Sequence, residues 1–546
     1  MTEEHVTQKN NFFSSSRNLA ISTLVSRILG QFRESLTATV IGGGALMSGW
    51  SFAVTGANLF RRILGEGELG KAIVPLLSLT LEAEGRERAR DRFSTILLWL
   101  TLLLCALAVL LGVPSWLISL ILKPGRWKTA FELFPLLTPY MVFICIVGAA
   151  TAYANVLHEF FLPSLTAILQ NVVLILALAL VCRRYQGILQ LKTLGFAVLV
   201  AGMLEMALIF LILWKRGMMV RISRAILRDR ETLLSIWKLV LPGLLGASAL
   251  QMSLLCDRWV AMLIGDYATS SIHFSERLVY LPVGIFAVSF ATVANTELSR
   301  LAASGNYNDL TAMLTKTIRI LLFVSVPFTM FMVCFPEEII RVFYDYGRFN
   351  ETAVWETVYA FLMYSAGIPL FAVFKISSVA FTSRRDMVTP LKVSLICITL
   401  NIVLNFALMV PLKQGGIALA TVVSSLLNNT LLLTIYNRQL PDNRIDFQKM
   451  DFFLLKLLLA CTLSLLPAFL VFRTVPRNMA FTLPHWNIEV ATLNNAVPLI
   501  SAGFVYGICL LALCWLFRIE ETAVVMGRIL RKKVYPGILY RKKSCE

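Results

Sequence analysis

The sequence predicts an all-α polytopic membrane protein with about fourteen transmembrane helices. Hydrophobic residues occupy 57% of the 546 positions and charged residues only 15%, whereas soluble domains carry about 25% charged residues. The hydrophobic residues gather in runs long enough to span about 30 Å of hydrocarbon. The net charge of +18 comes largely from basic residues between these runs. That pattern is typical of cytoplasmic loops and argues against nucleic acid as a partner.

Fourteen apolar segments are predicted to cross the membrane. Six of them lie near residues 18–40, 46–80, 93–122, 133–157, 161–182 and 194–214. Six more lie near residues 233–264, 272–299, 318–335, 355–381, 390–411 and 415–436. The last two lie near residues 452–472 and 497–517.

Lysine and arginine place both termini in the cytoplasm. Basic residues cluster in the segments 86–92, 215–230 and 531–543. An even number of helices puts these clusters on the side of the N-terminus, and the positive-inside rule makes that side cytoplasmic. Residues 1–17 and 518–546 are then the cytoplasmic ends, and residues 215–232 form a basic amphipathic linker on the cytoplasmic surface. The assignment leaves five basic residues on the opposite side, namely Lys123, Arg126, Lys128, Arg183 and Arg184.

An internal repeat indicates two lobes. Residues 171–178, NVVLILAL, recur about 230 positions later as residues 401–408, NIVLNFAL. Parallel repeats of this kind occur in transporters that bind their substrate where the two copies meet. We therefore expect two pseudo-symmetric six-helix lobes, residues 18–214 and 233–436. The two helices in residues 437–517 are an addition to the repeat.

The first two helices are too polar to face lipid. One carries Arg27, Arg33 and Glu34, and the other carries Asn58 and Arg61 on a polar stripe at helical spacing. A central arginine costs about 2.5 to 3.5 kcal/mol on an insertion scale, which is as much as about six leucines return. Such helices are tolerated when their charges face a water-filled cavity. An open alternative is a pair of amphipathic helices on the membrane surface.

The helices that open the second half are also charged, and the second of them carries Arg277. Arginines from both halves then predict a central cationic cavity for an anionic, phosphate-bearing ligand, because guanidinium matches phosphate oxygens. The predicted arginines are Arg27, Arg33, Arg61 and Arg277. The acidic residues Glu34, Asp257 and Glu276 leave an alternative open, in which acid–arginine pairs only hold the halves together.

A further polar group in the second half consists of Asp257, Asn401, Asn405 and Thr421. Asn401 and Asn405 share one helix face, and oxygen ligands of this kind suit a small hard cation. The alternative is hydrogen bonding between helices, which is common in membrane bundles.

Nothing in the sequence predicts catalysis. The four histidines form no HExxH pattern, and no GxxxxGK[ST] loop for ATP occurs. The ten cysteines show no CxxC or zinc-type spacing. We therefore expect no enzymatic activity and no cofactor other than the candidate cation.

Four blocks of the sequence resemble the MurJ (also called MviN) family of lipid II flippases, and the resemblance runs from about residue 17 to residue 520. The blocks are SRILGQFRE, NLFRRILGEGELGKAIVP, the stretch from LPGLLG to FSERLVYLPVG, and the stretch from SRRDMVTPLKV to LNIVLNFALMVPLKQGGIALAT. The resemblance implies the fourteen-helix fold of a two-lobed exporter superfamily. It also implies transport of lipid II, the undecaprenyl-diphosphate-linked peptidoglycan precursor, across the bacterial inner membrane.

The resemblance further implies roles for individual residues. The implied substrate-binding residues are Arg27, Arg33, Glu34, Arg61 and Arg277. The implied second-helix motif or gate consists of Asn58, Gly65, Glu66 and Gly67. The implied sodium site consists of Asp257, Asn401, Asn405, Thr421 and the Ile417 carbonyl. The chain departs from the family pattern at Ser48, where an aspartate is frequent, and at Asn405, where a second carboxylate can stand.

The expected partners are lipid II, membrane lipids and proteins of cell-wall synthesis, and we expect a monomer. The helices of residues 437–517 are candidates for a groove that holds the lipid tail. Two alternatives remain open at this point. One is a related exporter, such as a drug/cation antiporter or an O-antigen flippase. The other is an integral-membrane glycosyltransferase or a scaffold without transport activity.

Overall fold

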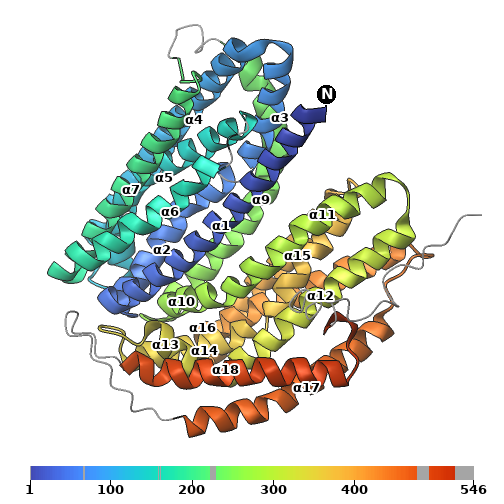
Figure 1. The fold of residues 1–546 in the computed structure, drawn as a ribbon. Coiled ribbons are helices and arrows are strands. Elements are labelled where there is room, and N and C mark those ends of the chain that lie inside the picture. The colour runs from blue at the N-terminus through green and yellow to red at the C-terminus, as the bar shows by residue number, and fades with distance from the viewer. Residues whose placement is uncertain are drawn as a thin grey trace, which may run out of the picture. The chain divides into compact units, whose positions relative to one another are not determined.

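The regular elements of the computed structural model are helices. The structure describes residues 2–65, 68–157, 159, 161–221, 229–475 and 491–522. Within these ranges there is no strand. The first elements (Figure 1) are α1 (Thr2–Ile41), α2 (Ala45–Phe60), η1 (Arg61–Gly65), α3 (Glu68–Ala83), α4 (Gly85–Ile121), α5 (Arg126–Val156), α6 (Phe161–Leu176), η2 (Ala177–Val181), η3 (Cys182–Arg184) and α7 (Gly187–Lys215).

The later elements include two of the longest helices in the described chain. They are α9 (Arg230–Ile264), α10 (Ala268–Pro282), η4 (Val283–Ala287), α11 (Val288–Ala303), α12 (Tyr307–Cys334), α13 (Pro336–Tyr344), α14 (Glu351–Ser365), α15 (Ile368–Thr382), α16 (Val388–Gln439), α17 (Phe447–Thr474) and α18 (Ala491–Leu516).

Each predicted apolar segment falls on a helix or on consecutive helices. In the described chain, eight helices are long and apolar enough to cross a membrane, and the pair α14 and α15, bent by 43°, would be a ninth. The 52-residue α16 contains Lys413, whose φ of 46° and ψ of −134° are not helical, and this break separates the two segments predicted there. The membrane-spanning helical class is therefore confirmed, whereas the total of fourteen spans stays a prediction.

The chain forms two compact units. Unit 1 comprises residues 1–277, 344–360 and 398–420, and unit 2 comprises residues 278–343, 361–397 and 421–546. The predicted lobes, 18–214 and 233–436, follow from the repeat and stay a prediction. Parts of the predicted linker (222–228) and tail (523–546) lie outside the described residues.

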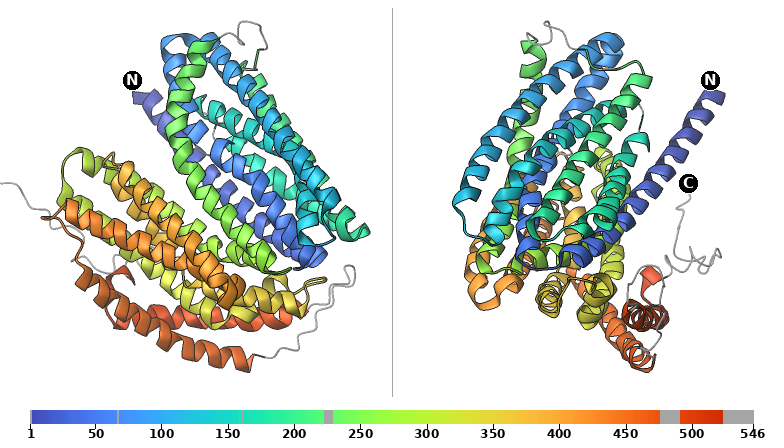
Figure 2. Two further views of the ribbon diagram at one scale, coloured as in Figure 1. Left: turned by 180° about the vertical axis from the view of Figure 1, so that it is seen from behind. Right: turned by 90° about the vertical axis from the view of Figure 1, so that its left-hand side faces the viewer.

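In unit 1, α5 contacts α2, α3, α4 and α7 (Figures 1 and 2). Two glycines of α7 permit close packing against α5. An added Cβ at Gly195 would lie 2.6 Å from Leu136 Cδ2, and one at Gly202 would lie 3.0 Å from Tyr140 Cδ2. Small residues allow helix backbones in membranes to approach closely. The α5–α7 contact therefore depends on these two positions.

In unit 2, α17 and α18 lie side by side (Figures 1 and 2). Arg319 of α12 lies 4.9 Å from the centre of the Phe453 ring on α17, and its Nε lies 2.6 Å from Glu521 Oε1. The Tyr506 hydroxyl of α18 donates to the Pro327 carbonyl of α12 at 3.2 Å. These contacts attach both C-terminal helices to α12. The lipid-tail groove predicted for them stays a prediction.

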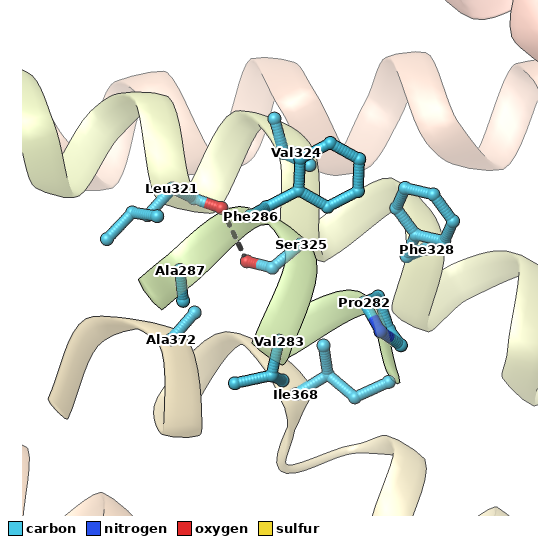
Figure 3. A pocket seen from close by; sticks show the side chains of 10 residues that line it. All are labelled: Pro282, Val283, Phe286, Ala287, Leu321, Val324, Ser325, Phe328, Ile368 and Ala372. Carbon is cyan, nitrogen blue, oxygen red and sulfur yellow. Dashed lines mark hydrogen bonds between the residues drawn. The ribbon is translucent and has the colours of Figure 1, made fainter. Parts of the chain in front are cut away.

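A small apolar pocket lies beside η4 in unit 2 (Figure 3). Its lining residues are Pro282, Val283, Phe286, Ala287, Leu321, Val324, Ser325, Phe328, Ile368 and Ala372. The Ser325 hydroxyl donates to the Leu321 carbonyl at 2.7 Å, so this polar group is already satisfied within its own helix. With an apolar lining of this kind, the pocket does not suit an anionic ligand.

Candidate functional site

Glu34 of α1 is the centre of a charged cluster in unit 1. Its carboxylate is 5% exposed and contacts three side chains. Arg33 Nη2 lies 2.5 Å from Oε1, and Arg277 Nε lies 3.3 Å from the same oxygen. His273 Nε2 lies 3.0 Å from Oε2. One carboxylate therefore joins α1 to α10 and holds two of the arginines predicted to form the cavity.

Asn171 of α6 provides a second partner for Arg33. Arg33 Nη1 donates to Asn171 Oδ1 at 2.9 Å. The Asn171 amide nitrogen donates to the backbone oxygens of Ser26, at 3.1 Å, and Ala167, at 2.9 Å. These two bonds fix the direction of the amide. Arg33 is consequently held by a carboxylate from its own helix and by an amide from α6. We call Arg33, Glu34, Asn171, His273 and Arg277 the Glu34 centre.

The exposure of the two arginines differs. The Arg277 side chain remains 46% exposed, whereas that of Arg33 is 18% exposed. Arg277 is therefore the more accessible arginine of the Glu34 centre. Next to Arg277 in the sequence, Glu276 pairs with Arg258 of α9.

Both sequence interpretations of the acidic residues describe part of this arrangement. Glu34 pairs with Arg33 and Arg277, as the interpretation based on structural ion pairs expects. Arg277 nevertheless keeps nearly half of its surface exposed, so it remains accessible to a ligand. Arg27 is partly exposed on α1, and Arg61 is the first residue of η1. The binding roles implied for these residues stay predictions.

Asp257 of α9 lies in a second polar cluster of unit 1. Asn405 Nδ2 donates to Asp257 Oδ1 at 2.5 Å and to Asn401 Oδ1 at 3.2 Å. The Ser253 hydroxyl donates to Asn401 Oδ1 at 3.3 Å. Asp257, Asn401 and Asn405 are at most 4% exposed. We call Ser253, Asp257, Asn401 and Asn405 the Asp257 centre, which joins α9 to the first half of α16.

The Asp257 centre fits a hard monovalent cation in part. One carboxylate and two amide oxygens are ligands that such an ion accepts. The Asn405 amide presents its nitrogen to Asp257, so an ion requires this amide to turn its oxygen inward. Ile417 is also buried in unit 1, whereas Thr421 belongs to unit 2. Among the described residues, no group of three or more histidine, cysteine or acidic side chains could hold a metal ion.

Ser48, the first of the two departures that the resemblance implies, is fully buried at the start of α2. Its hydroxyl donates to the Asp266 carbonyl at 2.6 Å and accepts from the Ser270 amide at 3.1 Å. A carboxylate at this position would face a carbonyl oxygen without a proton to donate. Serine therefore suits this contact between the starts of α2 and α10.

The implied second-helix motif is only partly described. Asn58 is half-buried on α2, and Gly65 ends η1. Glu66 and Gly67 lie outside the described residues. The gating role implied for these four residues stays a prediction.

Two glycines form a tight seam at the end of α1 in unit 1. Gly42 has φ +89° and Gly347 has φ +58°, a conformation that favours glycine. An added Cβ at Gly42 would lie 2.7 Å from the Arg348 carbonyl oxygen, and one at Gly347 would lie 2.5 Å from that of Thr39. Arg348 N donates to Thr39 O at 2.9 Å, and its side chain donates to Gln190 Oε1 at 3.0 Å. We call these contacts the Gly42–Gly347 seam.

Sequence reasoning missed Asn171 and the role of His273 in the Glu34 centre. Asn171 was not predicted as a partner of Arg33 because it begins an apolar run, although the repeat aligns it with Asn401. His273 lies four residues before Arg277 and therefore on the same helix face. Both signals were present in the sequence.

The family model described as "Lipid II flippase MurJ" matches residues 37–485. Relatives with the name "Probable lipid II flippase MurJ" include those of Buchnera aphidicola subsp. Acyrthosiphon pisum and Vibrio cholerae. The first is 27% identical over 499 residues, covering 90% of this chain and 94% of the relative. The second is 28% identical over 444 residues, covering 78% of this chain and 83% of the relative.

Solved structures share the fold. A lipid II flippase MurJ in an inward closed conformation matches with a TM-score of 0.74 and 22% identity, covering 94% of this chain and 99% of that chain. An inward-facing multidrug resistance MATE family transporter of the MOP superfamily matches with a TM-score of 0.61 and 15% identity, covering 77% and 97%. The family model covers well over half of the sequence, and the chain therefore belongs to the lipid II flippase MurJ family.

Proposed function

We propose that this protein moves lipid II from the cytoplasmic to the outer leaflet of the bacterial inner membrane, with both termini in the cytoplasm. Membership of the MurJ family and the membrane-spanning helical fold support the proposal. The observation that carries it is the Glu34 centre, in which Arg33 and Arg277 share one buried carboxylate while Arg277 stays 46% exposed.

The proposed binding step is an exchange of anions. Arg33 and Arg277 are stabilised within the membrane by Glu34 as long as no substrate is bound. The diphosphate of lipid II presents more oxygens and more negative charge than one carboxylate, and guanidinium groups bind phosphate oxygens in a bidentate manner. Arg277 engages the diphosphate first because it is the more exposed of the two. Arg27 and Arg61 extend the same cationic surface.

The proposed transport step is alternating access. The two lobes rock about the bound headgroup, and the lipid tail remains in the bilayer along α17 and α18. The outer faces of these helices suit that role, since Leu466, Leu470 and Phe504 are at least 64% exposed. The Gly42–Gly347 seam consists of backbone contacts and one arginine–glutamine bond. Such contacts can separate without leaving a buried charge unpaired.

A cation at the Asp257 centre is the second part of the proposal. Sodium bound by Asp257, Asn401 and Asn405 would supply a coupling ion whose gradient, together with the membrane potential, resets the transporter. Support comes from the burial of one carboxylate beside two amides that are one helical turn apart. The protein works as a monomer, and proteins of cell-wall synthesis are its expected neighbours.

Related exporters are the main alternative function, because MATE transporters share the fold. A drug/cation antiporter needs carboxylates facing its cargo, whereas Glu34 is enclosed by Arg33, His273 and Arg277. An O-antigen flippase would also bind a lipid diphosphate, so only the sugar-peptide headgroup distinguishes it from a lipid II flippase. A glycosyltransferase would alter its substrate chemically.

Reconstitution into liposomes with fluorescent lipid II tests the proposal. A reagent confined to the outside quenches the label on exposed headgroups, and chromatography checks that the lipid is chemically unchanged. We expect accelerated exposure of intact lipid II, and no acceleration for a labelled O-antigen lipid. Proteoliposomes that flip lipid II no faster than protein-free liposomes, or that convert it to another compound, would contradict the proposal.

A further inference from the structure

His273 of α10 is a buried histidine that the proposed binding step does not use. Its side chain is 11% exposed, and its Nε2 lies 3.0 Å from Glu34 Oε2 of α1. Histidine is the side chain whose charge ordinarily changes between about pH 5 and 8. The groups that surround His273 within unit 1 therefore decide when it carries a charge.

The two carboxylate oxygens of Glu34 have different partners. Arg33 Nη2 lies 2.5 Å from Oε1, and Arg277 Nε lies 3.3 Å from it, whereas His273 contacts Oε2. His273 and Arg277 are four residues apart, so they reach the carboxylate from the same face of α10. Departure of both guanidinium groups from Oε1 leaves the histidine contact at Oε2 in place. His273 is thus the partner that Glu34 retains when the arginines bind another anion.

The contact with Glu34 also fixes which nitrogen of His273 can take up a proton. A carboxylate only accepts hydrogen bonds, so Nε2 carries the hydrogen of this contact. In a neutral imidazole the other nitrogen, Nδ1, then carries none. A second proton therefore binds at Nδ1, and the imidazolium keeps its hydrogen bond to Glu34. Protonation converts this hydrogen bond into an ion pair with no change of partner.

Other charged and titratable groups near His273 have partners of their own. Glu276 of α10 pairs with Arg258 of α9. The Tyr344 hydroxyl of α13 donates to the Phe274 carbonyl at 3.2 Å. Two more charged residues follow or precede residues that contact α10, and each bonds a neutral amide, namely Arg348 with Gln190 and Glu356 with Gln414. The ion pairs of Glu34 itself are therefore the ones that an incoming anion rearranges.

We propose that His273 binds a proton when the diphosphate draws the guanidinium groups away from Glu34. The inference rests on the proposed function and deepens it. One proton from the surrounding water binds to Nδ1, and the imidazolium then balances a buried carboxylate that would otherwise lack a counter-ion. When the diphosphate leaves, the guanidinium groups return to Oε1 and the proton returns to water. An opposite charge favours the charged form of histidine, so diphosphate binding and proton binding strengthen each other.

Calorimetric titration of the full-length protein with farnesyl diphosphate tests the inference. Titrations near neutral pH in two buffers of different ionisation enthalpy count the protons taken up on binding. The wild type should take up to about one proton more than His273→Gln, because glutamine keeps a nitrogen donor for Glu34 but binds no proton. Protonation of the ligand itself cancels in this difference. Between about pH 8 and 6, the wild-type affinity should rise about 10-fold more than that of the variant.

Tyr344→Phe is the control, because it removes another titratable group beside α10 and leaves His273 in place. It should keep the wild-type proton uptake. Equal uptake by the wild type and His273→Gln would overturn the inference, although the diphosphate site itself would stand. Absence of farnesyl diphosphate binding by the wild type would instead reject the anion site of the proposed function, and the inference with it.

A spectroscopic measurement covers the case in which His273→Gln fails to fold. The sequence contains four histidines, and His273 remains alone after the substitutions His5→Gln, His158→Gln and His485→Gln. Nitrogen-15 NMR of the labelled ring distinguishes a neutral imidazole from an imidazolium. Farnesyl diphosphate near neutral pH should convert the neutral signal to that of the imidazolium. A ring that stays neutral at saturating ligand would overturn the inference.

Discussion

Asn171 and Asn401 occupy matching positions of the repeat, yet their surroundings carry opposite charge. Asn171 on α6 accepts a hydrogen bond from the Arg33 guanidinium of α1 at 2.9 Å. Asn401 on α16 accepts from the Asn405 amide, which also donates to Asp257 of α9 at 2.5 Å. In each half, an asparagine thus lies where the fifth helix of the predicted lobe approaches the first.

The same sequence pattern thus lies beside an arginine in one half and beside a carboxylate in the other. An amide offers both a donor and an acceptor, so the same residue fits beside an arginine or beside a carboxylate. Under the proposed function, the charge on the facing helix decides the ligand, so that the Glu34 centre binds an anion and the Asp257 centre binds a cation.

Arg277→Ala should have the largest effect, because it removes the most accessible cation of the Glu34 centre. We expect lipid II exposure in proteoliposomes to fall about 100-fold, since a charge-assisted contact contributes about 3 kcal/mol. Arg300→Ala is the matched control, because Arg300 pairs with Glu297 at the exposed surface of α11. Wild-type flipping by Arg277→Ala would remove the basis for an anion site.

Glu34→Gln should be the most destabilising substitution within the Glu34 centre. Removing one partner of a buried ion pair costs about 3 to 5 kcal/mol, and the partial exposure of Arg33 and Arg277 places the cost at the lower end. We expect a lower unfolding temperature of the purified protein in detergent. Added lipid diphosphate should restore part of the loss, since it replaces the missing negative charge. An unchanged unfolding temperature would show that Glu34 is not needed as a counter-ion.

Asn171→Asp should lower transport more than stability. A carboxylate adds a negative charge beside Arg33, but it cannot donate to the Ser26 and Ala167 carbonyls as the amide does, so the unfolding temperature should fall moderately. The same charge competes with the diphosphate, and flipping should fall about 10-fold, corresponding to about 1.4 kcal/mol. The measurements are thermal unfolding and lipid II exposure on the same preparation. Unchanged flipping by the folded variant would contradict the assignment of Arg33 to the anion site.

Asn405→Asp should have an effect of similar size that depends on the salt present. The substitution places a second carboxylate beside Asp257, and like charges at this distance repel. We expect the free energy of unfolding in KCl to fall by about 1 to 2 kcal/mol relative to the wild type. Thermal unfolding in NaCl provides the comparison. Sodium should recover most of the loss and should stabilise this variant more than the wild type. Equal stability in both salts would argue against an ion at the Asp257 centre.

The sequence was sufficient to predict the helical membrane class and most of the partners within the two centres. The polar residues of the helices and the internal repeat predicted one group with Arg33, Glu34 and Arg277 and another with Asp257, Asn401 and Asn405, and the structure brings the members of each into contact. A charge inside a membrane helix must find a partner, and the possible partners lie on few helices. The ligands of the two groups stay predictions.

Other features were beyond pattern reasoning. The π-helical turn η1 at Arg61 and the short helix α13 depend on local backbone geometry and packing, which hydrophobic periodicity does not report. The Gly42–Gly347 seam joins segments about 300 residues apart, and a glycine in sequence does not reveal its neighbour.

Thermal unfolding of the purified protein with two ligands tests the central contrast most directly. The ligands are farnesyl diphosphate and sodium, with potassium as the ionic-strength control, because a ligand that binds the folded state raises the unfolding temperature. We predict that Arg277→Ala loses stabilisation by the diphosphate but keeps that by sodium, and that Asp257→Asn shows the reverse. Stabilisation of Arg277→Ala by farnesyl diphosphate to the wild-type extent would contradict the assignment of the Glu34 centre as the anion site.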